Sequence, residues 1–477
     1  MQDVLDVAVV GGGISGLAAA YELQKRGLSV RVLEAGPRAG GVITTERFDQ
    51  WVIDGGPDSM LVQKPAAVAL CRELGIADRL VSTLTPRTAY ILRDRRLHRI
   101  AEGSFLGFPL DVGSLARSSV FTIGGRLRMA CEAIIPRPST YAQGAPSGVE
   151  GRGGGDDDES VGTFVRRRFG QEAVDYLAEP LLAGIHAGDV DRLSIRALFP
   201  RLLEAERQSG SVIRAFRAMR ARPSPQGAFV SLPGGTGELV DALVKALTPG
   251  TVSVSTHVAD IHRHTHYRVD TAAGPVEARA VILAVPAYVA ASLLRVFDTS
   301  IAALAEAIPY ASTATVALGY RREQVSHPMA GSGFVVPRVE RSPLLAATWV
   351  TSKWPHRAPD GHVLMRGFLG GGRDPRRLDA DDDELIGLVT DELHDLMGIS
   401  GEPLFTRLFR WTRQSPQYEV GHLQRAATID RQLASIPGLF VTGSGFRAIG
   451  IPDCIADGRD VAAKAAAFVA TKITQRG

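Results

Sequence analysis

The hydrophobic pattern at the start of the chain predicts a strand, a helix and a second strand. Residues 5–10 form an apolar run, residues 14–25 carry apolar side chains at helical spacing, and residues 30–33 form a second apolar run. Glycines separate the first run from the helix. This change of period from strand to helix and back is typical of a β-α-β unit with parallel strands.

The glycines between the first strand and the helix have the spacing of a dinucleotide site. Gly11 permits a tight turn, Gly13 lets backbone approach a pyrophosphate, and Gly16 lets the helix pack close on the strand. The helix N-terminus adds unpaired amides and a partial positive charge. Glu34, at the end of the second strand, is placed to accept hydrogen bonds from a ribose.

A second glycine pair narrows the choice of dinucleotide. Arg38, Gly40 and Gly41 follow the second strand, and the whole stretch resembles the FAD signature of the amine-oxidase-like flavoprotein superfamily. In that superfamily the second glycine pair lies against the phosphates of the flavin. The Glu34 carboxylate would repel a 2′-phosphate, which disfavours NADP.

The pattern further along the chain predicts that three separate segments build one nucleotide domain. Short strands are expected at 252–254, 257–261, 267–269 and 281–286, and a last strand at 439–443 precedes a helix that starts near residue 450. The predicted nucleotide-domain segments are 1–84, 226–286 and 411–477. Two insertions, a helical one at 85–225 and a substrate-binding one at 287–410, would cover the site.

Length and composition agree with several domains. The 477 residues exceed one ordinary core, and 45% apolar content is enough to fill two or three. A net charge of +3 gives no sign of a nucleic-acid binder. Residues 136–160 are too rich in glycine and acid to bury anything, so we expect a disordered loop between helices at 123–135 and 160–168.

Targeting and cysteine patterns favour the cytoplasm. The chain enters a strand almost at once, with no leader pattern, and its longest uncharged stretch, 280–294, is interrupted by Pro286 and too short to span a membrane. Peripheral membrane contact stays open. Cys71, Cys131 and Cys454 form no metal or redox pattern, so we expect three buried apolar residues.

Two clusters of ionisable residues have more than one interpretation. The basic run from Arg87 through Arg95 to residue 99 is more typical of the solvated face of a hairpin, but guanidinium groups could also clamp the carboxylates of an acidic substrate. His262, His264 and His266 share one strand face, where exposure is favoured over metal binding, and we predict no metal site.

The remaining motifs identify a narrower resemblance. Residues 179–189 read EPLLAGIHAGD and are followed by Leu193 and Ser194, a segment similar to one in the substrate domain of the porphyrinogen oxidases of haem biosynthesis. Further matches lie at 331–334, 353–359, 368–371, 410–411, 416–418, 421–422 and 450–454. The resemblance covers nearly the whole chain except 136–160, and the chain shows no GxSxG or HExxH nucleophile or metal pattern.

The resemblance implies an α/β fold with a Rossmann-type FAD-binding domain built from three segments, a mixed α+β substrate domain and a helical insertion. It also implies FAD as cofactor, dioxygen as acceptor, and removal of six electrons from a porphyrinogen with release of hydrogen peroxide. The expected FAD-binding residues are Gly11, Gly13, Ile14, Ser15, Gly16, Glu34, Ala35, Arg38, Gly40, Gly41, Gly56, Pro57, Asp58, Val258, Trp411, Gly443, Gly450 and Ile451.

The same resemblance implies a substrate site. Gly184 would offer its carbonyl to pyrrole N–H groups, Phe368 would stack on one ring, and Val335 and Thr348 would sandwich the macrocycle, although relatives place an apolar residue at Thr348. Relatives often have a basic residue where this chain has Thr88 and Ala89, so Arg87 or Arg95 is expected to bind a propionate. Asp58 is a candidate general base for an N–H proton.

The favoured substrate is coproporphyrinogen III, with protoporphyrinogen IX as the alternative. The basic run and residues 353–359 favour the substrate with four carboxylates. Two other classes stay open: a flavin amine oxidase or carotenoid desaturase, and a non-catalytic flavin protein that hands porphyrin to a later enzyme. The oligomeric state is not readable from the sequence.

Overall fold

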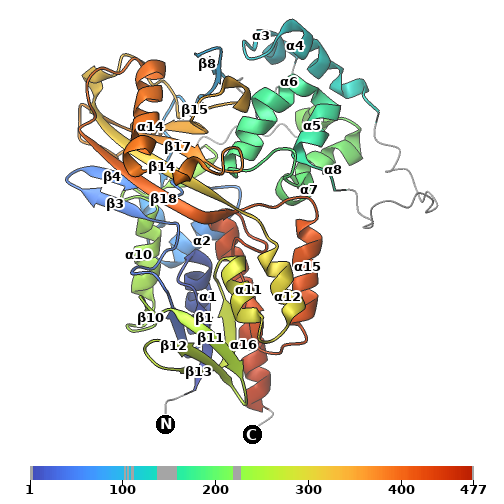
Figure 1. The fold of residues 1–477 in the computed structure, drawn as a ribbon, viewed down its shortest axis with the longest axis vertical. Helices are drawn as coiled ribbons and strands as arrows, with labels where there is room; N and C mark the ends of the chain where they lie inside the picture. Colours follow the sequence, from blue (N-terminus) through green and yellow to red (C-terminus); the bar gives the residue numbers. More distant parts are fainter. Residues whose placement is uncertain are drawn as a thin grey trace.

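The computed structural model describes residues 4–100, 104, 107–108, 112–136, 158–218 and 227–474. Two seven-stranded sheets and a helical module make up most of the molecule. In Figure 1 the first sheet and its helices form the lower part, the second sheet lies above it on one side, and the helical module lies above it on the other.

The first sheet is the nucleotide domain. Its order is β10-β2-β1-β13-β12-β11, with β19 added beside β13, and β1 is parallel to both β2 and β13. Its strands are β1 Leu5–Val10, β2 Val30–Leu33, β10 Val252–Ser253, β11 Val258–Arg263, β12 Tyr267–Thr271, β13 Val276–Leu283 and β19 Leu439–Val441. They come from three separate parts of the chain, so the predicted Rossmann-type assembly is confirmed.

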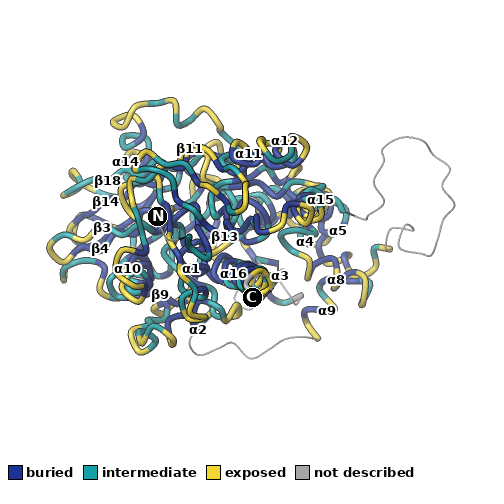
Figure 2. The backbone as a smooth tube through the Cα atoms, turned by 90° about the horizontal axis from the view of Figure 1, so that it is seen from below, coloured by how far each residue is buried: buried dark blue, intermediate teal, exposed yellow. Residues whose placement is uncertain are grey.

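Helices cover both faces of this sheet because its central strands are apolar on both sides. One face packs on α1 Ile14–Lys25, α2 Ala66–Glu73, α10 Gly237–Ala246 and α16 Ile451–Thr474. The other packs on α11 Ala287–Leu294, α12 Thr299–Glu306 and α15 His422–Leu433. Viewed from below, the buried stretches run through the middle, between exposed outer loops (Figure 2).

The second sheet has the order β18-β14-β17-β16-β15-β7-β8. Its strands are β7 Ala89–Arg93, β8 Arg96–Arg99, β14 Tyr310–Arg321, β15 Gly333–Val335, β16 Ala346–Trp349, β17 His362–Gly370 and β18 Phe405–Pro416. Helix α14, Asp382–Met397, packs on one face. The hairpin β7-β8 lies within the segment expected as a helical insertion, yet it pairs with β15 here.

Short elements connect the two sheets. The hairpin β3 Thr45–Phe48 and β4 Trp51–Asp54 lies between them, and a small sheet joins β5 Met60–Leu61, β6 Val81–Ser82 and β9 Phe229–Ser231. Single turns of helix complete the connections, at η1 Ala77–Arg79, η5 Arg322–Gln324, η6 Arg338–Glu340, α13 Val350–Lys353 and η7 Arg377–Asp379.

The helical module has its own apolar core. It contains α3 Val112–Arg117, α4 Ile123–Ala130, η2 Cys131–Ile134, α5 Val161–Phe169, α6 Gln171–Ala173, the π-helix η4 Val174–Ala183, α7 Ile195–Leu198, α8 Pro200–Ser209 and α9 Val212–Ala218. The helices expected on either side of residues 136–160 are confirmed, whereas residues 137–157 lie outside the described residues. Cys71 and Cys454 are buried as expected, but Cys131 is exposed because it starts η2 on the outer side.

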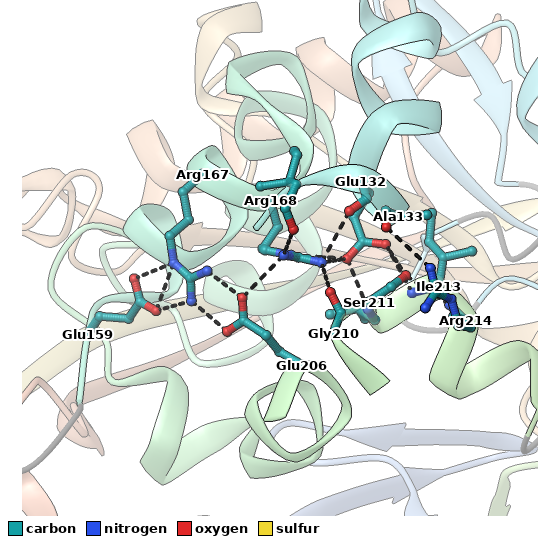
Figure 3. A network of polar contacts seen from close by, with 12 residues as sticks. Glu132, Ala133, Glu159, Arg167, Arg168, Glu206, Gly210, Ser211, Ile213 and Arg214 are labelled. Atoms are coloured by element: carbon teal, nitrogen blue, oxygen red, sulfur yellow. Dashed lines mark hydrogen bonds and ion pairs between the residues drawn. The ribbon is translucent and has the colours of Figure 1, made fainter. Parts of the chain in front are cut away.

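A buried charge network joins four of these helices (Figure 3). The Arg168 Nε donates to Glu132 Oε1 at 3.0 Å, and both side chains are fully buried. Arg168 also donates to the carbonyl oxygen of Gly210 at 2.7 Å, and the Val212 amide donates to Glu132 at 2.9 Å. The second guanidinium, that of Arg167, pairs with Glu206 and Glu159. Since every charge has a partner, the network fixes α5 against η2, α8 and α9.

Candidate functional site

The glycine turn after β1 has the geometry that its sequence predicts. Gly11 has a φ of +104°, and a methyl group there would collide with the backbone of Ala284 at the end of β13. A methyl group on Gly16 would collide with the carbonyl of Gly11 and lie 3.1 Å from the Cβ of Ala284. Glycine at both positions therefore lets α1 begin directly against the ends of β1 and β13.

Gly13 is different because the position that a Cβ would occupy there is open space. A Cβ at Gly13 would meet no atom within 4 Å, and the residue caps α1 with no side-chain hydrogen bond. The first-turn amides and the positive end of the helix therefore face free space of the kind a pyrophosphate requires. The Gly40 amide donates to the Gly12 carbonyl at 2.8 Å, which brings the second glycine pair beside this space. The residues present thus fit a dinucleotide.

Glu34 and Arg38 shape the two glycine loops. The Glu34 carboxylate accepts the amides of Gly12 at 2.6 Å and Gly36 at 2.7 Å, one on each oxygen. The Arg38 guanidinium donates to the carbonyls of Gly41 at 2.7 Å and Ile43 at 3.0 Å. Both side chains therefore hold backbone in place, and each carboxylate oxygen of Glu34 retains a lone pair for a ribose hydroxyl.

Two of the expected FAD-binding residues, Ala35 and Val258, lie next to Glu34. Ala35 follows Glu34 directly, and the Thr256 amide donates to the Glu34 carbonyl at 2.7 Å. Val258 begins β11 two residues later and is buried. The structure therefore brings residues 34–35 and residues 256–258 together at the end of β2.

The carboxyl-terminal segment meets the same glycine turn. The Gly443 amide donates to Asp457 Oδ2 at 2.9 Å, and Gly450, with a φ of +93°, precedes Ile451, the first residue of α16. A methyl group on Gly458 would collide with the Ser15 carbonyl, so α16 crosses the first turn of α1 at close range. The N-termini of the two helices consequently lie near each other.

The turn after β4 lies between the two sheets. The Trp411 Nε1 donates to the Gly55 carbonyl at 3.0 Å, and the Arg366 guanidinium donates to the Gly56 carbonyl at 2.6 Å. A methyl group on Gly56 would collide with the Val42 carbonyl. The expected flavin-edge residues Gly56, Pro57 and Asp58 are thereby held against β17 and β18.

Asp58 is an ion-pair partner of two cations. Its carboxylate accepts both hydrogen bonds of Lys353 at 2.8 and 2.9 Å, accepts the Trp354 indole at 3.3 Å and lies 3.7 Å from Arg366. Burial alone would raise the pKa of Asp58, but Lys353 and Arg366 hold that pKa well below its usual range. The group therefore stays ionised and is a weak base, which speaks against its taking a pyrrole proton.

The register of the second sheet places the expected macrocycle contacts on one face. Val335 pairs with Ala346, which pairs with Phe368, and Thr348 in the next row pairs with Arg366. Directly opposed residues share a face, so Val335, Thr348 and Phe368 lie together. Helix α14 packs on the opposite face.

Gly184 follows the π-helix of the EPLLAGIHAGD segment. Its carbonyl accepts the amide of Ala187 at 3.0 Å, and the Ala187 carbonyl accepts the amide of Gly372 at 2.7 Å. Gly372 lies two residues after the end of β17, so this segment approaches the same end of the strand that carries Phe368. The structure thus brings Gly184 near the end of β17 that carries Phe368.

Of the two arginines expected to bind propionate, Arg95 lies away from the other substrate candidates. Arg95 pairs with Glu392 at 2.6 Å and Asp395 at 3.4 Å, both on α14, so it is tied to the face opposite Phe368. Arg87 is exposed and donates to the Thr83 carbonyl at 3.2 Å. The structure therefore does not place Arg95 with the other substrate candidates.

Sequence reasoning missed Arg366 and Arg357. Arg366 lies in the middle of β17 and is almost fully buried, and Arg357 pairs with Asp54 at 3.1 Å. The signal for Arg366 was available: it is the one charged residue between apolar positions 363–365 and 367–370. A lone charge in a buried strand requires a partner, which sequence spacing alone does not reveal.

Comparisons with known proteins agree with this geometry. The family model for flavin-containing amine oxidoreductase matches residues 14–466. The chain is 35% identical to coproporphyrinogen III oxidase of Bacillus subtilis over 97% of this chain and 98% of that protein. It is 29% identical to the mitochondrial protoporphyrinogen oxidase of Nicotiana tabacum, over 96% and 94% of the two chains.

A solved structure is similar throughout. A protoporphyrinogen oxidase candidate from Exiguobacterium sp. 255-15 superposes with a TM-score of 0.86 and 31% identity, covering 98% of this chain and 99% of that chain. A putrescine oxidase, 18% identical with a TM-score of 0.68, shares the fold.

Proposed function

Because the chain belongs to the flavin-containing amine oxidoreductase family and its cofactor is FAD, we propose that it oxidises a porphyrinogen to a porphyrin, with coproporphyrinogen III as the favoured substrate. The observation that carries this proposal is the 35% identity with a coproporphyrinogen III oxidase over almost the full length of both proteins. The shared sheet face of Val335, Thr348 and Phe368 supports it.

The chemistry removes six hydrogens in three two-electron steps. Bound FAD supplies the two-electron acceptor, and three dioxygen molecules take up the electrons to give three molecules of hydrogen peroxide. The chain contributes binding and orientation: the α1 amides hold the pyrophosphate, Gly56 and Trp411 line the ring site, and Phe368 positions the macrocycle.

The substrate preference has a direct test. Coproporphyrinogen III and protoporphyrinogen IX are offered separately to the holoenzyme, and porphyrin fluorescence gives kcat/KM for each. We expect faster turnover of coproporphyrinogen III. A tenfold preference for protoporphyrinogen IX reverses the assignment.

Anaerobic mixing separates the other function classes. We expect coproporphyrinogen III to bleach the flavin absorption within turnover time. Bleaching by an amine or a polyene, and not by either porphyrinogen, would indicate an amine oxidase or a desaturase. A flavin that no porphyrinogen reduces would indicate a non-catalytic carrier, for which hand-over to a later haem-pathway enzyme is the expected role.

An apolar stripe supports peripheral membrane contact. Ile123, Leu127 and Ile134, on α4 and η2, are 75%, 63% and 79% exposed. Within the described part of the chain, no helix combines the length and apolarity that crossing a bilayer needs. The stripe suits insertion into a lipid surface. We expect the Leu127→Glu variant to bind vesicles less than wild type in flotation assays, and equal binding would refute the contact.

A further inference from the structure

Three cations and two carboxylates lie together where the Gly55–Asp58 turn meets the second sheet; Asp54, Arg357 and Arg366 are buried, and the Lys353 and Asp58 side chains are 15% and 11% exposed. Lys353 and Arg366 flank Asp58, and Arg357 pairs with Asp54. The Arg357 and Arg366 side chains are at most 3% exposed. Three positive charges against two negative charges leave one positive charge in surplus in a largely buried site.

The hydrogen bonds around Asp54 do not remove this surplus. Asp54 accepts hydrogen bonds from the hydroxyl of Thr45 at 2.6 Å and from the amide of Thr236 at 2.9 Å, both neutral donors. No further carboxylate pairs with Lys353, Arg357 or Arg366 within the residues that the structure describes. An uncompensated buried charge is costly unless the functional complex supplies its counterpart.

Arg366 also has an N–H donor that is not used in a hydrogen bond within the described structure. One of its terminal nitrogens donates to Gly56, but its Nε, although buried, has no hydrogen-bond partner in the described structure. The ring of Phe368 lies 5.0 Å from the guanidinium carbon. Arg366 is thus anchored to the turn expected at the flavin edge and lies beneath the residue expected at the macrocycle.

We propose that Arg366, held in place by Asp58 and the Gly56 carbonyl, directs this surplus positive charge at the bound flavin and stabilises the negative charge that the ring acquires on reduction. The inference rests on the proposed function for its flavin. Lys353 and Asp58 are positioning residues that set the local charge. A propionate of the substrate is the competing anion, but the near-complete burial of Arg366 and its bond to the Gly56 backbone favour the cofactor.

The reduction potential of the bound flavin tests this inference without any substrate. FAD-loaded variants are equilibrated anaerobically with a redox dye, and the midpoint potential is read from flavin absorption. We expect Arg366→Met to lower the potential by about 30 mV or more, which is tenfold in the preference for reduced flavin. We expect Arg366→Lys, which keeps the charge, to lie nearer wild type. The matched control Arg268→Met removes an exposed arginine of β12 and should leave the potential unchanged.

The sign of the shift distinguishes electrostatics from a disturbed fold. Lys353→Met removes a positive charge and should lower the potential, whereas Asp58→Asn removes a negative charge and should raise it. Shifts of the same sign, or an FAD-bound Arg366→Met with the wild-type potential, overturn the inference. A raised KM for porphyrinogen with an unchanged potential assigns Arg366 to a substrate carboxylate, which also overturns it.

The remaining outcomes are equally decisive. Should Arg366→Met not fold, the opposed pair Lys353→Met and Asp58→Asn carries the test. If the FAD-loaded variants show these shifts, yet wild type oxidises no porphyrinogen, the proposed function fails while this inference stands.

Discussion

Two neighbouring glycines should respond oppositely to the same added methyl group. Gly13 has room for a Cβ in the FAD-free chain and extended backbone at φ −70° and ψ 175°, which alanine adopts. Gly16 has no such room, because a Cβ there would lie 3.2 Å from the Gly11 carbonyl carbon and closer still to its oxygen. Carbon atoms normally approach to about 3.5–4.0 Å, so α1 would have to move.

The expected magnitudes follow from this difference. We expect Gly16→Ala to cost about 1–3 kcal/mol in the stability of the apoprotein through overpacking. We expect Gly13→Ala to change that stability by no more than about 0.5 kcal/mol. Its methyl group would instead occupy the space beside the α1 amides, so FAD affinity should fall at least tenfold, or about 1.4 kcal/mol.

Two measurements separate these effects. Urea unfolding of the deflavinated protein gives stability, and quenching of FAD fluorescence on titration gives affinity. Gly387→Ala is the matched control, since Gly387 lies within α14 and a Cβ there meets nothing within 4 Å. This control should bind FAD as wild type does. Wild-type affinity in Gly13→Ala would refute the placement of the pyrophosphate at this turn.

Three further outcomes are expected. Glu132→Ala strands the buried Arg168 charge and should destabilise the helical module by about 3–5 kcal/mol, measured as faster hydrogen exchange in α5 and α9; unchanged exchange would contradict the network's role. Burial lowers the pKa of His422 to about 4, and its Nε2–H donates to the Phe446 carbonyl, so the fold favours the neutral ring. The contribution of His422 to the free energy of unfolding is therefore present above pH 6.5 and is lost as the pH falls toward 4. Between pH 7 and pH 5 the free energy of unfolding of wild type should fall by about 2 kcal/mol more than that of His422→Gln. Equal losses in the two proteins would contradict this. Phe368→Ala should raise KM for porphyrinogen at least tenfold, or about 1.4 kcal/mol, with unchanged FAD affinity; loss of FAD binding would place Phe368 elsewhere.

Local sequence patterns were enough to predict the nucleotide domain. The β1-α1-β2 unit depends on spacing within about 30 residues, and the glycines report constraints that the backbone itself imposes. The returning strands were visible because residues 280–283 of β13 and all of β19 are apolar, as expected for strand segments covered on both sides.

Non-local pairing was beyond the reach of sequence pattern. The β7-β8 hairpin has a clear alternation, but nothing in it specifies that β15, more than 200 residues later, is its neighbour. The same limit explains Arg95, whose partners on α14 lie about 300 residues away. The π-helical geometry of Val174–Ala183 was also not predicted, because its Pro180 favours a break in the helix instead.

The crossing of α16 over the first turn of α1 has a consequence for biogenesis. The glycine turn expected to receive the pyrophosphate is packed against α16, which follows Gly443 in the chain. We therefore expect a nascent chain that still lacks α16 to bind FAD more weakly than the full chain, so that cofactor capture falls late in synthesis.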